Sequence, residues 1–207
     1  MANHKETISV GILLIFYLIG IGGVVFGDAE SFLSLTPLNL LLTLGIIFWN
    51  HADWKGWWIF LLTYVGGLVI EIIGVNTGWP FGIYHYGNVL GPKIFDTPWI
   101  IGVNWLMLLY ATNSIANRIG TTVLIRVAIS AALMTILDIL IEPVAIQMDF
   151  WTWENPTVPL SNYLSWFVLS ALLSFPWQYS RLNLNKSIGF AVFLVQIIFF
   201  GALTILA

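Results

Sequence analysis

Long runs of apolar residues, separated by short polar connections, dominate this chain. A helix needs roughly 20 apolar residues, within a range of about 17–25, to cross hydrocarbon about 30 Å thick. By that measure the pattern predicts seven spans, which are Ile8–Phe26, Leu35–Trp49, Trp57–Gly74, Trp99–Ala116, Thr121–Ile146, Tyr163–Tyr179 and Ile188–Leu206. We therefore expect an all-α, polytopic membrane helix bundle that forms one integral membrane domain over residues 1–207.

The first predicted span could also be interpreted as a secretion signal, because Lys5 precedes its apolar run. The run is longer than such a signal needs, however, and Asp28-Ala29-Glu30 is a poor match to a small-residue cleavage site. We therefore interpret Ile8–Phe26 as a retained membrane helix.

The composition agrees with a membrane protein and excludes several functional classes. Hydrophobic residues make up 59% of the chain and charged residues only 8%, against about 25% charged residues in a soluble domain. This excludes a water-soluble enzyme, a nucleic-acid-binding protein and a disordered regulator. The chain has no cysteine, which removes thiolate catalysis and iron–sulfur clusters. Its three histidines are too few for a membrane di-iron hydroxylase or desaturase.

Basic residues predict the orientation of the bundle. Most of them lie at the N-terminus or in the connections after spans 2, 4 and 6, namely Lys5, Lys55, Arg118, Arg181 and Lys186. The opposite side carries only Lys93. Because cytoplasmic loops are enriched in Lys and Arg, we expect the N-terminus in the cytoplasm and the C-terminus outside, in a multi-pass protein of the cell membrane.

Three carboxylic acids fall within the predicted spans. Glu71 lies in the last turn of the third span, and Asp138 and Glu142 lie near the end of the fifth. Both spans run outward, so the three carboxyl groups reach a similar depth. Asp138 and Glu142 are four residues apart and share one helix face. Ionisable groups are costly in hydrocarbon, so we expect these acids to face a cavity or a partner. The alternative is that they cap helices or bond to buried polar groups.

Two outer connections flank these acids and are rich in aromatic residues. In the first, 74–87, the candidates for substrate contact are Trp79, Phe81, Tyr84 and Tyr86. In the second, 148–155, they are Asp149, Trp151 and Trp153. His85 is a candidate proton donor or relay, and Asn104 in the outward half of the fourth span joins the site at the same depth. A membrane-interface belt of Trp and Tyr is the alternative explanation for the aromatic residues.

These residue types favour acid chemistry on a lipid. No set of metal ligands, glycine-rich phosphate loop or dinucleotide-binding motif is present, so we expect no metal and no cofactor. Burial disfavours the ionised form of a carboxyl group, so one acid can remain protonated while a better-hydrated carboxylate acts as a base. Aromatic faces attract cations. Together these groups suit protonation of an alkene, stabilisation of the carbocation, and then capture by water or loss of a proton.

The motifs that carry these acids resemble a known family. Glu71-Ile-Ile-Gly74 followed by Gly78-Trp-Pro-Phe-Gly-Ile-Tyr84-His-Tyr86, and Asp138-Ile-Leu-Ile-Glu142-Pro143-Val-Ala145 followed by Trp151-Thr-Trp153, are similar to segments of membrane carotenoid-biosynthesis proteins. This family includes the carotenoid 1,2-hydratases of the CruF type, and the resemblance covers roughly residues 65–180. It implies addition of water across the terminal C1–C2 double bond of an acyclic, lycopene-like carotenoid, without a redox cofactor. The implied partners are the carotenoid, water and membrane lipids, with no nucleic acid.

Combining the residues with the resemblance gives a working hypothesis. One of Asp138, Glu142 or Glu71 protonates C2, and a tertiary cation forms at C1. The aromatic rings that stabilise this cation are drawn from Trp79, Phe81, Tyr84, Trp151 and Trp153. The attacking water is held by a second carboxylate, by His85 or by Asn104. Glu142 and Asp138 are the favoured acids, and Glu71 is the favoured residue to position water.

Two other functions fit the same residues. A carotenoid cyclase or isomerase would use the same acid and cation but release a proton instead of adding water. A transporter or non-catalytic carotenoid-binding scaffold could also contain intramembrane acids. No inverted repeat or pair of broken helices supports transport.

Overall fold

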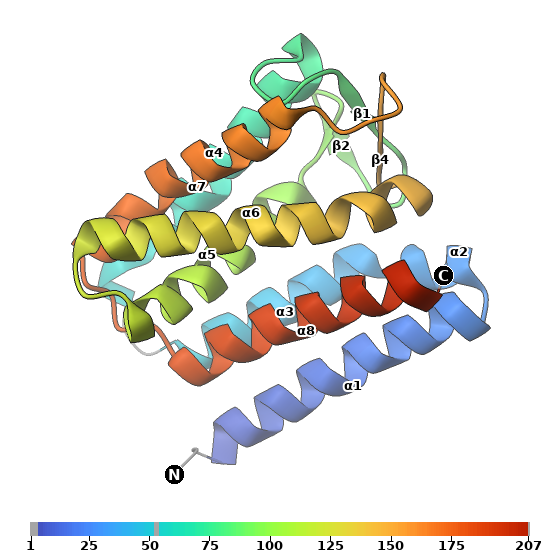
Figure 1. Cartoon of the computed structure of the whole chain (residues 1–207). Coiled ribbons are helices and arrows are strands. Elements are labelled where there is room, and N and C mark those ends of the chain that lie inside the picture. Colours follow the sequence, from blue (N-terminus) through green and yellow to red (C-terminus); the bar gives the residue numbers. More distant parts are fainter. Residues whose placement is uncertain (1–3, 52–53, 207) are drawn as a thin grey trace.

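The computed structural model describes residues 4–51 and 54–206. Within these residues the chain forms long helices that run side by side (Figure 1). They are α1 (His4–Phe26), α3 (Thr36–Asn50), α4 (Trp57–Thr77), α5 (Ile100–Ile119), α6 (Val123–Gln147), α7 (Leu160–Tyr179) and α8 (Lys186–Leu206). Each predicted span coincides with one of these helices, with ends that differ by a few residues. The short helices α2 (Ala29–Leu33) and η1 (Trp54–Gly56) precede α3 and α4.

Five helical segments are long and apolar enough to cross a membrane. They are His4–Phe26, Ala29–Asn50, Trp54–Thr77, Val123–Gln147 and Lys186–Leu206. The predicted helical membrane bundle is therefore confirmed. Because α5 and α7 do not meet the same measure of length and apolarity, the count of seven spans and the orientation of the termini stay predictions.

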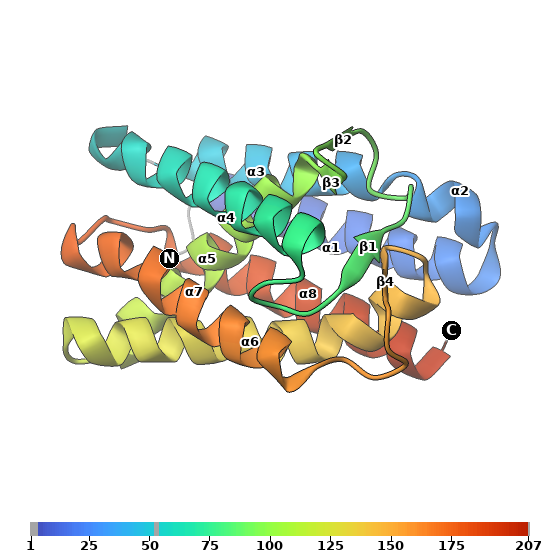
Figure 2. The same ribbon diagram turned by 90° about the horizontal axis from the view of Figure 1, so that it is seen from above.

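Helix α5 occupies the centre of the bundle. It packs against α3, α4, α6, α7 and α8, and most of its residues are buried (Figures 1 and 2). Helices α4 and α7 lie on one side of α5 and α6, and α1, α3 and α8 lie on the other (Figure 1). A helix surrounded by other helices needs less apolar surface than one that faces lipid, which explains the more polar sequence of α5.

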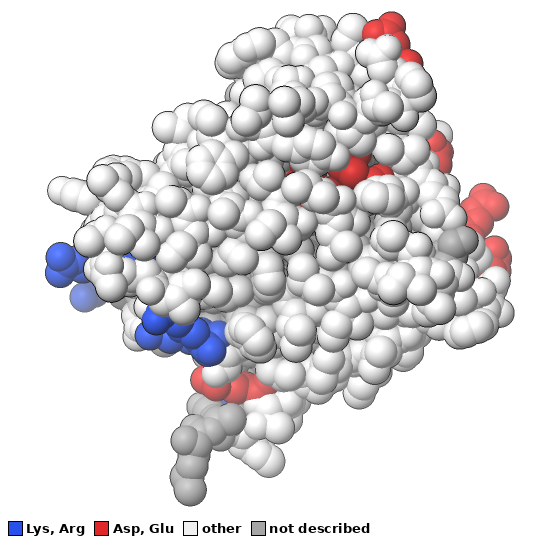
Figure 3. All heavy atoms as spheres, in the orientation of Figure 1, with Lys and Arg blue, Asp and Glu red and all other residues white. Residues whose placement is uncertain are grey.

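Charged side chains gather at opposite ends of the bundle. In the face drawn in Figure 3, Lys and Arg lie at one end and most Asp and Glu lie at the other, and acidic atoms are also visible in a hollow near the middle. The basic end includes Lys55 before α4, Arg118 near the end of α5 and Lys186 at the start of α8. This separation of charge is the spatial counterpart of the loop asymmetry in the sequence.

Two pairs of short strands cover the acidic end of the bundle. Strand β1 (Tyr84–Tyr86) pairs antiparallel with β4 (Trp151–Trp153), and β2 (Lys93–Ile94) pairs with β3 (Thr97–Pro98). In the β1–β4 ribbon, Tyr84 lies opposite Trp153 and Tyr86 lies opposite Trp151. The sequence analysis treated both segments as connections and did not predict that they pair. The pairing joins the end of α4 to the end of α6.

Candidate active site

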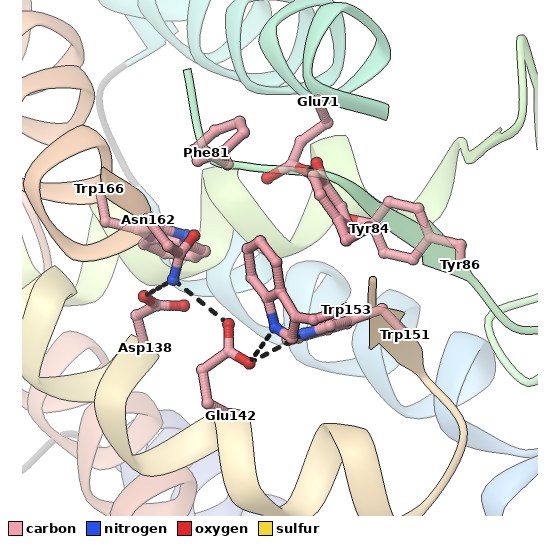
Figure 4. A pocket seen from close by; sticks show the side chains of 10 residues that line it. All are labelled: Glu71, Phe81, Tyr84, Tyr86, Asp138, Glu142, Trp151, Trp153, Asn162 and Trp166. Atoms are coloured by element: carbon pink, nitrogen blue, oxygen red, sulfur yellow. Dashed lines mark hydrogen bonds between the residues drawn. The ribbon is translucent and has the colours of Figure 1, made fainter. Parts of the chain in front are cut away.

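The three intramembrane acids line one cavity of about 260 Å³, here called the acid cavity (Figure 4). It lies between α4, α6, α7 and the β1–β4 ribbon. Its lining consists of carboxyl, amide and aromatic side chains, namely Glu71, Phe81, Tyr84, Tyr86, Asp138, Glu142, Trp151, Trp153, Asn162 and Trp166. The acids themselves are almost fully buried, with 4% of Glu71, 1% of Asp138 and 2% of Glu142 exposed.

Glu71 receives three hydrogen bonds. The hydroxyl groups of Tyr84 and Tyr86 donate to its Oε2 at 2.6 and 2.8 Å, and the indole Nε1 of Trp105 donates to its Oε1 at 2.9 Å. An ionised carboxylate only accepts hydrogen bonds, so three donors suit its charged form. Trp105 is held in turn by stacking on Trp166, with ring centroids 4.5 Å apart.

Glycine on either side of Glu71 lets these donors approach α4. A Cβ atom at Gly67 would lie 2.6 Å from Cβ of Trp105, and one at Gly74 would lie 2.9 Å from the Tyr84 hydroxyl. Residues 67, 71 and 74 share one helix face because three or four residues make about one turn. Small residues at these two positions therefore open the space that the Glu71 donors fill.

Asp138 and Glu142 form a pair on one face of α6, joined by an amide. Nδ2 of Asn162 donates to Oδ2 of Asp138 at 2.7 Å and to Oε1 of Glu142 at 3.2 Å. The indoles of Trp151 and Trp153 donate to Oε2 of Glu142 at 3.1 and 2.9 Å. Glu142 thus has three donors, whereas Asp138 has one and its Oδ1 makes no hydrogen bond to the described residues.

The β1–β4 ribbon aims four aromatic rings at the cavity. Side chains alternate along a strand, so Tyr84 and Tyr86 face one way and His85 faces the other. The ring centroids of Tyr84 and Trp153 are 5.1 Å apart, and those of Tyr86 and Trp151 are 5.9 Å apart. The tyrosines bind Glu71 of α4 while the tryptophans bind Glu142 of α6. The ribbon therefore fixes the spacing of two helices and of their carboxyl groups.

Helix α7 anchors the turn that leads into the ribbon. Ser161 donates to the backbone oxygen of Phe81 at 2.8 Å, and Ser165 donates to that of Pro80 at 3.0 Å. These two bonds hold Phe81 against the cavity. Both come from α7, the helix that also supplies Asn162. Gly78, with φ of 73°, ends α4 in the left-handed conformation that glycine adopts without steric cost.

The two ribbon tyrosines stay neutral over a wide pH range. Burial, and secondarily the negative charge of Glu71, raises the pKa of Tyr84 and of Tyr86 well above the ordinary value of 10.0. Both phenols therefore remain hydrogen-bond donors at physiological pH.

Four of the predicted site residues lie outside the acid cavity. His85 is exposed on the outer face of β1, and Trp79 is 66% exposed. Asp149 is exposed in the turn after α6, and its backbone packs against Gly87. Asn104 lines an adjoining cavity instead, where its side chain makes no hydrogen bond to the described residues. The other eight predicted residues line the acid cavity.

The sequence analysis missed three residues of the site, Trp105, Asn162 and Trp166. Asn104 was predicted from its depth in the fourth span, but consecutive residues on a helix point about 100° apart, and it is Trp105 that faces Glu71. Asn162 and Trp166 are one turn apart on α7 and both buried. The spacing of four residues places both side chains on one helix face, but it does not indicate which residues they contact.

The arrangement offers two carboxyl groups with three donors each, one carboxyl group with a single donor, and several aromatic faces. It can therefore hold a proton beside fixed negative charge in surroundings that exclude bulk water. Within residues 4–51 and 54–206, no group of three or more His, Cys, Asp and Glu side chains is arranged to hold a metal ion.

Comparison with known proteins gives two matches and one negative result. Residues 33–207 match the family described as carotenoid biosynthesis protein. The chain is similar to bisanhydrobacterioruberin hydratase of Haloarcula japonica, with 31% identity over 142 residues. That alignment covers 61% of this chain and 47% of the relative, so the chain spans about half the length of that protein. No solved structure matches the chain.

Proposed function

The chain belongs to the carotenoid biosynthesis protein family, and from this we propose that it is a carotenoid hydratase. In this proposal it adds water across the terminal C1–C2 double bond of an acyclic, lycopene-like carotenoid, without a cofactor, in the cell membrane. The relative that is named as a hydratase supports the reaction type, and the apolar helices support a substrate drawn from the bilayer.

One observation carries the proposal, namely the unequal hydrogen bonding of three carboxyl groups in one aromatic cavity. Glu71 and Glu142 each accept three hydrogen bonds, which favours their carboxylate forms. Asp138 accepts one, and a second anion one helical turn from Glu142 would be unfavourable. Asp138 is therefore the acid that holds the proton before the reaction.

The proton moves from Asp138 to carbon and returns from water. The O–H bond of Asp138 breaks as a C–H bond forms at C2, and the π electrons of the alkene make that bond. This leaves a tertiary cation at C1. After water adds to C1, Glu71 accepts the proton that the water loses, and that proton returns to the Asp138–Glu142 pair before the next cycle. The pair holds one proton before and after the cycle, so no external acid, base or oxidant is consumed.

The remaining groups stabilise the cation and position the water. The faces of Phe81, Tyr84 and Trp166 offer cation–π stabilisation, and the two carboxylates add electrostatic stabilisation. Glu71 lies across the cavity from the acid pair, where it can accept a hydrogen bond from the attacking water (Figure 4). Asn104, in the adjoining cavity, has an amide available for a second water.

The proposal is tested by supplying lycopene and measuring the molecular mass of the product. The protein is expressed in cells that accumulate lycopene, and the pigments are analysed by liquid chromatography and mass spectrometry. We expect a new pigment heavier by one water, absent from cells that express Asp138→Asn. Asp96→Asn, in an exposed turn remote from the cavity lining, is the matched control and should give the same product as the wild type.

A product of unchanged mass would contradict hydration and indicate a cyclase or isomerase. Unaltered lycopene, beside normal amounts of inserted protein, would contradict catalysis on this substrate.

A further inference from the structure

A second cavity adjoins the acid cavity, and a third adjoins the second. The middle cavity, of about 540 Å³, lies between α1, α3, α5, α6 and α8. The lateral cavity, of about 660 Å³, lies between α1, the α2–α3 region and α8. Neither is part of the acid site described above.

Each cavity shares lining residues with the next one. Trp151 lines both the acid cavity and the middle cavity. Thr36, Asn39 and Phe199 line both the middle cavity and the lateral cavity. The three cavities are therefore neighbours, with Trp151 standing between the first two and Thr36, Asn39 and Phe199 between the last two. They lead from the acids to the space between α1, α3 and α8, which lie beside one another in Figures 1 and 2.

The lining of the middle and lateral cavities is uncharged. No Asp, Glu, Lys, Arg or His lines either of them among the described residues. Apolar side chains dominate, including Val24 and Leu33 in the lateral cavity and Ile141 and Phe200 in the middle cavity. Polar but uncharged side chains also line the middle cavity, namely Tyr17, Thr36, Asn39, Asn104 and Gln196. An ion, a phosphate headgroup or a charged peptide would lose its hydration here without gaining a partner of opposite charge, whereas a hydrocarbon chain would not.

The lateral cavity reaches the lipid-facing surface. Four of its lining residues are 46–60% exposed, namely Phe16, Ile19, Leu35 and Leu38. They lie on α1 and at the start of α3, both within segments apolar enough to span a membrane. The lateral cavity thus opens between exposed apolar side chains, which suits entry of an apolar ligand from the bilayer.

We propose that the middle and lateral cavities form one channel that binds the polyene chain of the substrate while its end group occupies the acid cavity. This inference rests on the proposed function. Hydration alters only the end of a long, stiff hydrocarbon, so the rest of the molecule needs an apolar site continuous with the acids. The middle cavity lies directly behind Trp151, so in this proposal the end group sits on one side of that ring and the chain on the other. Thr36, Asn39 and Phe199 must move aside for the chain to extend into the lateral cavity.

Narrowing the channel far from the acids tests this proposal. A Cβ atom at Gly20 would lie 3.2 Å from Cε2 of Phe199, the ring shared by the middle and lateral cavities. Gly20→Phe therefore fills the channel. Gly22→Phe is the matched control on the same helix, because a Cβ there meets nothing within 4 Å. Thr36→Phe narrows the junction from α3 and provides a second, independent variant.

Two readouts apply to each purified variant, the lycopene retained per protein and the relative hydration of a long and a short substrate. The short substrate is a C15 acyclic isoprenoid with the same terminal alkene. For Gly20→Phe and Thr36→Phe we expect retained lycopene and its hydration to fall by about tenfold or more, the scale of a lost pocket contact. Hydration of the short substrate should remain within about twofold of Gly22→Phe.

The outcomes separate the channel from the reaction. Equal lycopene retention and equal substrate ratios in all three variants would overturn the channel, even if the wild type hydrates lycopene. Lycopene retained by the wild type and lost in the narrowed variants, without any hydration, would support the channel and contradict the proposed function. Co-purified phospholipid in place of lycopene, unchanged by narrowing, would also overturn the channel.

Discussion

At the scale of single residues, the three carboxyl groups differ through their neighbours. Glu71 and Glu142 lie on different helices, yet each accepts two bonds from the β1–β4 ribbon and one from another helix. Asp138 accepts only the bond from Asn162. The same functional group is thereby prepared for two tasks, since a well-solvated carboxylate stabilises positive charge and a poorly solvated acid gives up its proton to carbon.

Removing the proton donor should abolish turnover without unfolding the bundle. Asp138→Asn keeps the size of the side chain and its contact with Asn162 but has no acidic proton. General acid catalysis contributes about 10²–10⁴-fold, so we expect product formation to fall by that factor. Product per inserted protein, measured by chromatography, checks this, with Glu154→Gln as an exposed acid control. Activity within threefold of the wild type would exclude Asp138 as the donor.

The ribbon tyrosines should make the folded state less stable at high pH. The unfolded chain releases its phenol protons near pH 10, whereas burial and Glu71 keep Tyr84 and Tyr86 protonated in the folded state. Their contribution to the free energy of unfolding is complete below pH 10 and is lost as pH rises beyond it, by about 1.4 kcal/mol per pH unit for each tyrosine. Denaturant unfolding in detergent at pH 9 and pH 11 should show a smaller loss for Tyr84→Phe than for the wild type. Equal losses would contradict this role.

At the scale of elements, the β1–β4 ribbon connects α4 to α6 through a few side-chain hydrogen bonds to Glu71 and Glu142. Gly74 leaves room on α4 for the Tyr84 hydroxyl, and Gly67 leaves room for Trp105 of α5. The site is thus built by the ribbon together with α4, α5, α6 and α7, and a small change on α4 affects the packing of the ribbon.

Adding one methyl group should lower the free energy of unfolding on this face of α4 but raise it at an open position of α3. In Gly74→Ala the new Cβ would lie 2.6 Å from Phe81 and 2.9 Å from the Tyr84 hydroxyl. We expect the free energy of unfolding to fall by about 1–3 kcal/mol, as in other overpacked sites. Gly45→Ala on α3, where a Cβ meets nothing within 4 Å, should instead raise it by about 0.4–1 kcal/mol. Denaturant unfolding of both variants in one detergent gives the comparison, and a stabilised Gly74→Ala would contradict the packing described.

The elements also explain what the sequence could and could not predict. Helices were predictable because apolar runs are local and long, and all seven segments coincide with helices. The pairing of Tyr84–Tyr86 with Trp151–Trp153 joins residues more than 60 positions apart, and no local pattern encodes such a partner. The outward direction of His85 follows from that pairing and was equally hidden. Depth along the fourth span predicts the level of Asn104, but it does not say which side of α5 faces Glu71, and Asn104 lines the adjoining cavity.

At the scale of the whole molecule, the bundle separates two environments that the reaction needs. The acid cavity holds charge and hydrogen bonds beneath the ribbon, and the adjoining hollow is uncharged and reaches the lipid-facing surface. In the proposed reaction, a long apolar substrate would remain among apolar side chains while only its end group meets the acids. The chain is an integral membrane protein, and this division explains why its polar groups are concentrated in so few places.

The most direct test of this account follows the atoms of one water molecule. Purified protein is given lycopene in detergent with D₂O in one sample and H₂¹⁸O in another, and the position of each label is read from the fragment masses of the product. The account predicts one deuterium at C2 and one ¹⁸O at C1 of the product. The Asp138→Asn variant should form no labelled product. A product without ¹⁸O, or with oxygen derived from O₂, would contradict hydration by the acid cavity.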